Sequence, residues 1–250
     1  MQELSLKGCT VGIAHISGGI LFFKNRDLAR EYCINNIYVI QSTPKIYTLK
    51  GVNLQTKELE GVSIGVNKYK VCVANTHVVS TPDIAYDILC GTLLNKVKEK
   101  NDVPKVVRGF VRDNTLQGGR ILVSSPKWSY LIEVFKKEYK IKEIKGDFVI
   151  TNRFSLISYK SAGLKPPQES CTRLKTANRM IKKISSIKGL KGMLRSHVPQ
   201  KGKMSVCRHG KRNATESSHI IQIQGEHISW SSLVGYPCEN DYNTIQLFQK

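Results

Sequence analysis

Changes in the spacing of apolar residues divide the chain into alternating groups of predicted strands and helices. Short apolar runs with a period of two predict strands, and apolar residues three or four positions apart predict helices. The order is strands, helices, strands, helices, strands, which predicts an α+β fold with helices packed outside antiparallel sheets. The predicted strands are 10–14, 19–23, 37–41, 45–49, 61–66, 71–74, 121–124, 129–135, 139–144, 148–151, 219–224, 227–233 and 244–248. The predicted helices are a segment beginning at Thr81, then 103–111, 170–185 and 187–196.

Turn-forming residues separate neighbouring strands. Ser17-Gly18-Gly19 and Gln224-Gly225-Glu226 predict two hairpins, and Asn67-Lys68 predicts a third. Gly146-Asp147 follows the strand 139–144 and predicts that this strand turns directly into the strand 148–151.

The chain has 250 residues and shows neither an internal repeat nor a linker, so we expect a single domain. No apolar run approaches the roughly 20 residues that span a bilayer, so we expect no membrane association. The seven cysteines are scattered and form no Cys-x-x-Cys pair, which favours a reducing, cytoplasmic location. Cys207 and His209 alone offer too few ligands for a metal ion, so we predict neither a metal site nor a cofactor.

Basic residues are concentrated in one part of the chain. The formal net charge is +20, and the block from Lys160 to Arg212 contains fifteen Lys and Arg against a single acid, Glu169. Such a block is typical of a nucleic-acid partner but also of a solvated lysine-rich surface. Aromatic residues are almost absent from it, and it contains no known nucleic-acid motif, which argues against readout by base stacking.

Cys9 is the candidate nucleophile of the chain. It follows Gly8 and begins a predicted strand. If the bond between Gly8 and Cys9 were cut, the new α-amine, with an ordinary pKa of about 7.7–8.0, would lie beside the thiol and could act as its base. An isolated Gly-Cys pair is more often simply a buried cysteine at the start of a strand.

The segment 22–27 strengthens the case for Cys9, because a hairpin would bring it back beside the thiol. Asp27 could hold the α-amine of Cys9, and Arg26 or Lys24 could lower the pKa of the thiol. The alternative is a surface Arg–Asp pair that contributes little to stability. His77 is a further candidate base that could line a substrate pocket.

Five segments of the chain resemble two related enzyme families, the isopenicillin-N acyltransferase-like and the choloylglycine-hydrolase-like families. Both are N-terminal-nucleophile (Ntn) hydrolases that act on linear amides. The segments are Gly8-Cys9-Thr10 with 19–27, then 65–71 with Ala74-Asn75-Thr76-His77, Ile150-Thr151-Asn152-Arg153-Phe154, Ser205-Val206-Cys207-Arg208-His209 with 215–218, and Gly235-Tyr236-Pro237-Cys238-Glu239.

The resemblance implies a four-layer αββα Ntn-hydrolase sandwich with two antiparallel sheets. It implies that residues 1–8 are a propeptide removed by self-cleavage at Gly8–Cys9, and that residues 9–250 form one domain. Cys9 would be the nucleophile, and Asn75 and Asn152 would donate to the oxyanion. Asp27 would orient the α-amine, and Arg208 would lower the pKa of the thiol.

The sequence departs from the family pattern at several positions. Lys24 stands where the bile-salt-hydrolase-like proteins carry arginine, and lysine does not replace a planar bidentate donor. Arg153 replaces the usual histidine, which could change substrate preference. Tyr69-Lys70-Val71 stands in place of a Gly-Leu pair. We expect Lys24, Arg26, His77 and Arg153 in the substrate pocket.

The resulting hypothesis is a self-processing cysteine amidohydrolase or acyltransferase that acts on a small-molecule amide or acyl donor through a Cys9 thioester. One alternative is a nucleic-acid-binding protein that uses the block 160–212. Another is an inactive scaffold with the same fold. A homo-oligomer is compatible with each of these.

Overall fold

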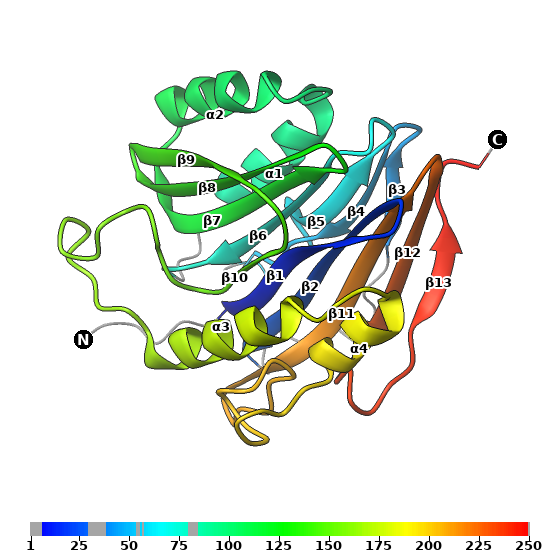
Figure 1. Ribbon diagram of the computed structural model, residues 1–250. Helices are drawn as coiled ribbons and strands as arrows, with labels where there is room; N and C mark the ends of the chain where they lie inside the picture. The colour runs from blue at the N-terminus through cyan, green and yellow to red at the C-terminus, as the bar shows by residue number, and fades with distance from the viewer. Residues whose placement is uncertain (1–6, 30–38, 54–55, 57, 80–84, 250) are drawn as a thin grey trace.

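Two antiparallel sheets packed face to face form the middle of the molecule, and two helices cover the outer face of each sheet (Figure 1). The computed structural model describes residues 7–29, 39–53, 56, 58–79 and 85–249. This arrangement is the four-layer αββα sandwich predicted from the sequence. Residues 1–6 of the predicted propeptide and the predicted helix start at Thr81 lie outside the described residues.

One sheet has six strands in the order β10-β1-β2-β11-β12-β13. Its strands are β1 (Lys7–Ile16), β2 (Gly19–Ala29), β10 (Phe148–Ile150), β11 (Asn213–Gln224), β12 (His227–Val234) and β13 (Asn243–Gln246). The first two form the predicted hairpin, with Gly18 in the turn at a φ of 75° that favours glycine.

The other sheet has seven strands in the order β3-β4-β5-β6-β7-β8-β9, so every strand pairs with its neighbour in sequence. Its strands are β3 (Ile40–Thr43), β4 (Ile46–Lys50), β5 (Val62–Asn67), β6 (Cys72–His77), β7 (Leu116–Ser125), β8 (Trp128–Lys136) and β9 (Glu138–Ile144).

The predicted pairing of β9 with β10 is wrong. The turn at Gly146 does follow β9, but it carries the chain across to the other sheet, where Ile150 of β10 pairs with Val11 of β1. β9 is a largely exposed edge strand rich in charge, whereas Val149 and Ile150 are buried. Burial of these two side chains against β1 therefore decides which sheet β10 joins. The crossing also delivers the next residues of the chain to the end of β1 that carries Cys9.

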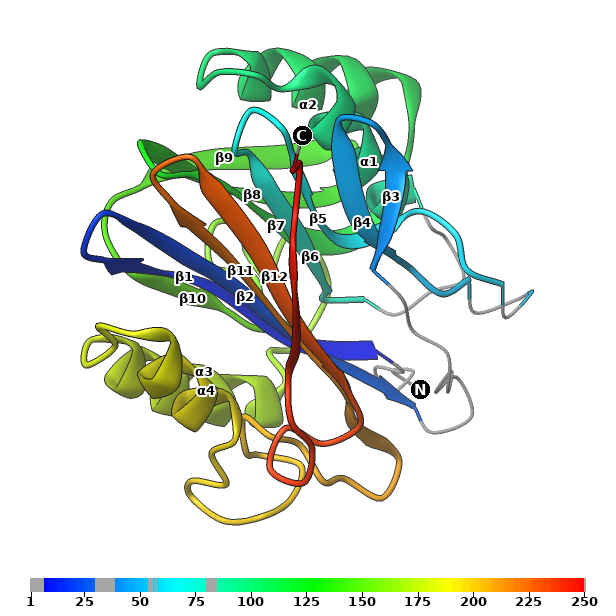
Figure 2. The ribbon, with the colours of Figure 1, turned by 90° about the vertical axis from the view of Figure 1, so that its right-hand side faces the viewer.

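The helices cover the outer faces of the sheets (Figure 2). They are α1 (Ala85–Lys96), α2 (Asp102–Asp113), α3 (Gln168–Ile181) and α4 (Ile187–Leu194). Leu93 and Val107 pack α1 and α2 on the seven-stranded sheet, while Ala177 and Leu190 pack α3 and α4 on the six-stranded sheet. At α4 the hydroxyl of Ser186 accepts the N–H of Gly189, which satisfies one free donor of the first turn.

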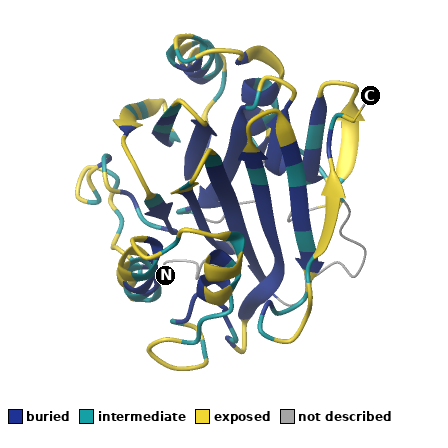
Figure 3. Ribbon diagram, turned by 45° about the vertical axis from the view of Figure 1, so that its right-hand side comes forward, coloured by how far each residue is buried: buried dark blue, intermediate teal, exposed yellow. Residues whose placement is uncertain are grey.

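The central core lies between the two sheets, where β2, β5 and β6 are buried almost throughout, whereas the edge strand β13 is exposed (Figure 3). Ile13 and Phe22 of the six-stranded sheet meet Ile64 and Leu122 of the other sheet. Burying each such side chain contributes about 1.5–3 kcal/mol. Among the described residues, no helix combines the length and the apolar character that a membrane span requires. All the cysteines within the described ranges are free thiols.

Candidate active site

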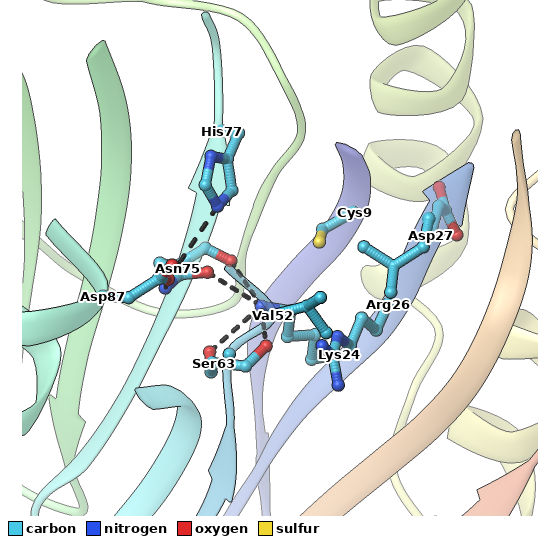
Figure 4. Close-up of a pocket in the computed structure, with 11 residues that line it drawn as sticks. Cys9, Lys24, Arg26, Asp27, Val52, Ser63, Asn75, His77 and Asp87 are labelled. Carbon is cyan, nitrogen blue, oxygen red and sulfur yellow. Dashed lines mark hydrogen bonds and ion pairs between the residues drawn. The ribbon is translucent and has the colours of Figure 1, made fainter. Parts of the chain in front are cut away.

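Cys9 lies in β1, in a small cavity at one end of the interface between the two sheets. Its side chain is 3% exposed, and in the β1–β2 register it faces Arg26, while Gly8 faces Asp27. The free interior of the cavity is about 10 Å³, which accommodates about one water molecule. The cavity is lined by Cys9, Lys24, Arg26, Asp27, Leu28, Gly51, Val52, Ser63, Asn75, His77 and Asp87. In Figure 4 the sulfur of Cys9 is directed toward the side that carries Asn75 and His77, whereas the carboxyl group of Asp27 points away from the sulfur.

Asn152 holds the backbone nitrogen of Cys9. Its Oδ1 accepts the Cys9 N–H at 2.9 Å and a guanidinium N–H of Arg173 at 2.6 Å. Its Nδ2 donates to Thr76 Oγ1 at 2.8 Å and to the His77 carbonyl at 2.7 Å. Because an amide has two N–H groups, both are used, and the predicted oxyanion role would require one of them to be released. In this structure Asn152 positions the nitrogen that would become the α-amine.

Asp27 has one occupied and one unoccupied carboxylate oxygen. Its Oδ1 accepts the hydroxyl of Thr215 at 2.9 Å, and its buried Oδ2 has no hydrogen-bond partner among the described residues. A Cβ placed on Gly8 would lie 3.2 Å from this Oδ2, so the oxygen adjoins the bond that precedes Cys9. An unsatisfied buried oxygen is costly unless a donor arrives. The position fits the predicted role of Asp27 as the acceptor for a Cys9 α-amine.

Lys24 links the two sheets beneath Cys9. Its ammonium donates to the carbonyl and hydroxyl of Ser63 at 3.0 and 2.7 Å, and to the carbonyl and Oδ1 of Asn75, both at 2.9 Å. Burial lowers the pKa of Lys24. Burial raises the pKa of the Cys9 thiol, and among the cations that oppose this, Lys24 has the largest effect and Arg26 a smaller one.

Asn75 is also fully engaged. Its Nδ2 donates to the Val62 carbonyl at 2.9 Å and to Asp87 Oδ1 in a short hydrogen bond. His77, which lines the cavity as expected, has its Nε2 3.8 Å from Asp87 Oδ1. The oxyanion role predicted for Asn75 would therefore require its amide to leave Asp87 or Val62.

A β-bulge in β11 brings further charged groups to the site. The register against β2 shifts between Thr215 and Ser217, so Glu216 is the extra residue. Its carboxylate pairs with Arg26 at 3.4 Å, and both side chains are buried. The bulge thus gives Arg26 a counter-charge and places Thr215 on Asp27.

Arg208 lies beside the predicted cleavage site. It pairs with Glu169 in a short hydrogen bond, and a Cβ on Gly8 would come within 2.7 Å of its Nη1. Among the cations that oppose the rise in the pKa of the Cys9 thiol, Lys24 has the largest effect and Arg26 a smaller one. The effect of Arg208 on the thiol stays a prediction, and its guanidinium lies beside Gly8.

Arg153, which the sequence predicts in the substrate pocket, is not among the residues that line the Cys9 cavity, and its place in a substrate pocket stays a prediction. Its charge acts instead on Tyr159, where burial raises the pKa and Arg153 opposes that rise. The chain turns immediately after Asn152, since the Arg153 N–H bonds back to the Thr151 carbonyl at 2.7 Å. Neighbouring residues in the motif therefore point to different parts of the molecule.

Three site residues carry no signal in the sequence: Ser63, Asp87 and Arg173. Asp87 stands in the first turn of α1, and Arg173 lies in α3, where burial lowers its pKa to about 10. Each reaches the site from a helix or strand distant in sequence, so spacing could not indicate them. The His and Cys side chains that could hold a metal ion lie outside this cavity, around His209.

Three solved structures are similar to this one over most of its chain. A mutant of the conjugated bile acid hydrolase of Clostridium perfringens has a TM-score of 0.57 at 15% identity, covering 96% of this chain and 92% of that chain. Another variant of that hydrolase has a TM-score of 0.52 at 12% identity, covering 95% of this chain and 97% of that one. A Caenorhabditis elegans ortholog of N-acylethanolamine-hydrolyzing acid amidase has a TM-score of 0.50 at 13% identity, covering 85% and 92%. No protein-family model matches the sequence, and no curated protein matches it either.

Proposed function

From the Ntn-hydrolase fold that the chain shares with these structures, we propose that it cuts itself between Gly8 and Cys9 and then hydrolyses a small-molecule amide. The observation that carries the proposal is the surroundings of the Cys9 nitrogen. Asn152 already accepts its N–H, and the unpartnered Oδ2 of Asp27 adjoins Gly8. These two acceptors suit an α-amine better than an amide, because the amine has additional N–H donors.

The self-cleavage proceeds by acyl transfer from nitrogen to sulfur. The Cys9 thiol loses its proton and attacks the Gly8 carbonyl carbon, and the C–N bond breaks as the nitrogen takes up a proton. Water then hydrolyses the thioester, which releases the Gly8 carboxylate and restores the thiol beside a free α-amine. Gly8 leaves its carbonyl open to this attack, and a side chain there would require the guanidinium of Arg208 to shift.

In turnover the α-amine is the base. It takes the thiol proton as Cys9 attacks the amide carbon of the substrate, and it returns the proton to the leaving amine. The acyl group remains on Cys9 as a thioester until water releases it as a carboxylic acid. Asp27 and Asn152 orient the amine throughout, while Lys24 stabilises the thiolate.

We infer an N-acyl amide as the substrate class, with the acyl group on Cys9. The similar structures are named for hydrolysis of conjugated bile acids and of N-acylethanolamines, which share an acyl group joined to a small amine. The cavity before cleavage holds about one water. An acyl group therefore needs more room beside Cys9 than the uncleaved chain provides.

Intact mass tests the processing step. The purified chain should begin at Cys9, while the Cys9→Ala chain keeps all preceding residues and hydrolyses none of the amides tested. Cys171→Ala, which changes a free thiol in α3, is the matched control and should be processed normally. A wild-type chain that stays full-length through long incubation contradicts self-cleavage.

A panel of N-acyl amides tests the turnover step. Bile-acid conjugates, N-acylethanolamines and N-acyl amino acids are incubated with the processed chain, with and without an added amine. Release of the free acid supports hydrolysis. Accumulation of the acylated amine in place of the acid would identify an acyltransferase. If a processed chain converts no member, the substrate class is wrong although self-cleavage stands.

A further inference from the structure

Four side chains with ligand atoms for a metal ion converge on one point beside β11 and β12. They are His197, Cys207, His209 and Cys238, and one ligand atom from each lies within 4.8 Å of all the others. His197, Cys207 and His209 belong to the connection between α4 and β11, and Cys238 belongs to the turn after β12. Cys207 is buried and the other three are partly buried.

The contacts of His209 cannot all be hydrogen bonds. Its Nε2 lies 3.2 Å from His197 Nε2, 3.4 Å from Cys207 Sγ and 3.2 Å from Cys238 Sγ. A ring nitrogen of neutral histidine offers either one N–H or one lone pair, so it can form one good in-plane hydrogen bond. Three partners at that distance require another explanation.

His219, which is fully buried, shows the ordinary pattern of histidine contacts. His219 has one partner on each ring nitrogen: Nε2 lies 3.0 Å from Ser217 Oγ, and Nδ1 accepts the indole N–H of Trp230 at 3.3 Å. Both nitrogens of His219 are satisfied once each. The crowding around His209 Nε2 is therefore a property of that cluster and not of buried histidines in this protein.

A tetrahedral metal ion accounts for the distances. Zn–N bonds of about 2.0–2.1 Å and Zn–S bonds of about 2.3 Å place neighbouring nitrogens about 3.3 Å apart and a nitrogen and a sulfur about 3.6 Å apart. The His197–His209 distance of 3.2 Å and the Cys207–His209 distance of 3.4 Å are close to these edges, and the Cys238–His209 distance of 3.2 Å is about 0.4 Å shorter than such an edge. All four ligand atoms lie within 4.8 Å of one another, so a bound ion would draw the widest pair closer together.

We propose that His197, Cys207, His209 and Cys238 bind a structural Zn²⁺ ion. Two thiolates and two imidazoles in a tetrahedron are typical of zinc, and a site filled by four protein ligands leaves no open position for catalysis. Cys207 and Cys238 bind as thiolates, so each loses its thiol proton to solvent when the ion enters.

Backbone hydrogen bonds and a ring contact hold the ligand residues in position. The Cys207 N–H donates to the Ser196 carbonyl, and the His209 N–H donates to the Gly202 carbonyl, both at 3.0 Å. The ring of Tyr236 stacks on His209 with centroids 3.9 Å apart. Such contacts fix the orientation of the ligands, as hydrogen bonds to the ligating residues do at other metal sites.

The ion would give the long connection between α4 and β11 a fixed anchor. Residues 195–212 contain neither helix nor strand, and such a connection has little core of its own. Arg208 stands between two of the ligands and faces Gly8. On the proposed function, the zinc site therefore also holds Arg208 against the cleavage site.

The sequence alone predicts no metal site, because only Cys207 and His209 stand close together in it. His197 is ten positions before Cys207, and Cys238 follows β12, so the spacing matches no metal motif. The pairing of β11 with β12 brings Cys238 back to the other ligands.

Metal analysis of the protein purified under reducing conditions without chelator tests the proposal. We expect about one zinc per chain, with the metal lost in Cys207→Ser and Cys238→Ser and kept in the control Cys171→Ser. We also expect the ligand variants to melt about 5–10 °C lower, and wild-type protein treated with a chelator to melt equally early and recover on adding Zn²⁺.

Cobalt substitution keeps the test decisive if the ligand variants do not fold. Wild-type protein stripped of metal and given Co²⁺ should show thiolate-to-cobalt charge-transfer absorption and visible bands of a tetrahedral ion. A protein that contains no zinc and takes up neither Zn²⁺ nor Co²⁺ overturns the proposal, as does a Cys207–Cys238 disulfide in freshly purified protein. The Cys9→Ala chain should retain its zinc. A failure of self-cleavage therefore does not affect the test of the zinc site.

Discussion

Cys9 and the pair Cys207 and Cys238 differ in what surrounds the sulfur. Cys9 lies among cations, with Lys24 and Arg26 opposing the rise in its pKa, and with an unpartnered carboxylate oxygen nearby. Cys207 and Cys238 face a histidine nitrogen that already has another imidazole against it. The difference indicates that the arrangement of partners, and not burial of the thiol, separates the proposed nucleophile from the proposed ligands.

Asp27→Asn should have the largest effect of the substitutions, and it should affect the Cys9 site alone. The amide keeps the shape of the side chain but removes the charge that would hold the α-amine, so we expect about a 100-fold loss in the rate of amide hydrolysis. Stopped assays on processed protein measure the rate, and metal analysis should show unchanged zinc. Asp147→Asn, a partly exposed carboxylate paired with His15, is the control. Equal losses of amide hydrolysis in Asp27→Asn and Asp147→Asn would show that Asp27 has no specific role at the Cys9 site.

Lys24→Met should have a smaller effect, on the pH profile. Because Lys24 is the cation that most lowers the pKa of the Cys9 thiol, its removal raises that pKa. The thiolate fraction at a given pH then falls about tenfold each time the thiol pKa rises by one, and self-cleavage should need a higher pH. Cleavage rates measured across pH 6–10, roughly the range in which a thiol ionises, show how far the profile moves.

Lys70→Met changes a lysine that pairs at the surface with Glu226, and it should leave the cleavage profile in place. If the pH profile of self-cleavage is unchanged in Lys24→Met, Lys24 does not lower the pKa of the Cys9 thiol. A loss of zinc in Lys24→Met would show that the two cysteine sites are not independent.

At neutral pH His219→Gln should have the smallest effect of these substitutions, and its effect at lower pH sharpens the contrast with His209. Burial lowers the pKa of His219 to about 3, so the folded state keeps it neutral while the unfolded state takes up a proton below about pH 6.5. The free energy of unfolding should therefore fall with decreasing pH, by up to about 1.4 kcal/mol for each pH unit between these values. Urea unfolding at several pH values should show a shallower slope in the variant, whereas exposed His15→Gln should match wild type.

The sequence predicted the fold well because its evidence is local. Two-residue and helical periods mark strands and helices directly, and the β1–β2 hairpin alone places Asp27 opposite the residue before Cys9. The pairing of β9 with β10 was wrong because sheet membership depends on burial against β1, which is not local. Asp87 and Arg173 reach the site from helices in opposite outer layers, so no spacing could indicate them.

The roles of individual side chains were harder to predict than their presence. Asn75 and Asn152 both lie at the site, yet an amide cannot be assigned as an oxyanion donor until its other partners are known. Arg153 adjoins Asn152 in sequence, but the turn after Asn152 directs it elsewhere. The histidine and cysteine cluster depends on the return of β12 beside β11.

The pairing of β1 gives the proposed terminus an unusual property. Every residue from Cys9 to Ile16 is in register with β2, and the middle of the strand also pairs with β10. A chain end is ordinarily the part of a protein with the greatest freedom, but this one would be created inside a sheet that already holds it. The amine and thiol would thus act at high effective molarity from the moment of cleavage, with little conformational search before the first turnover.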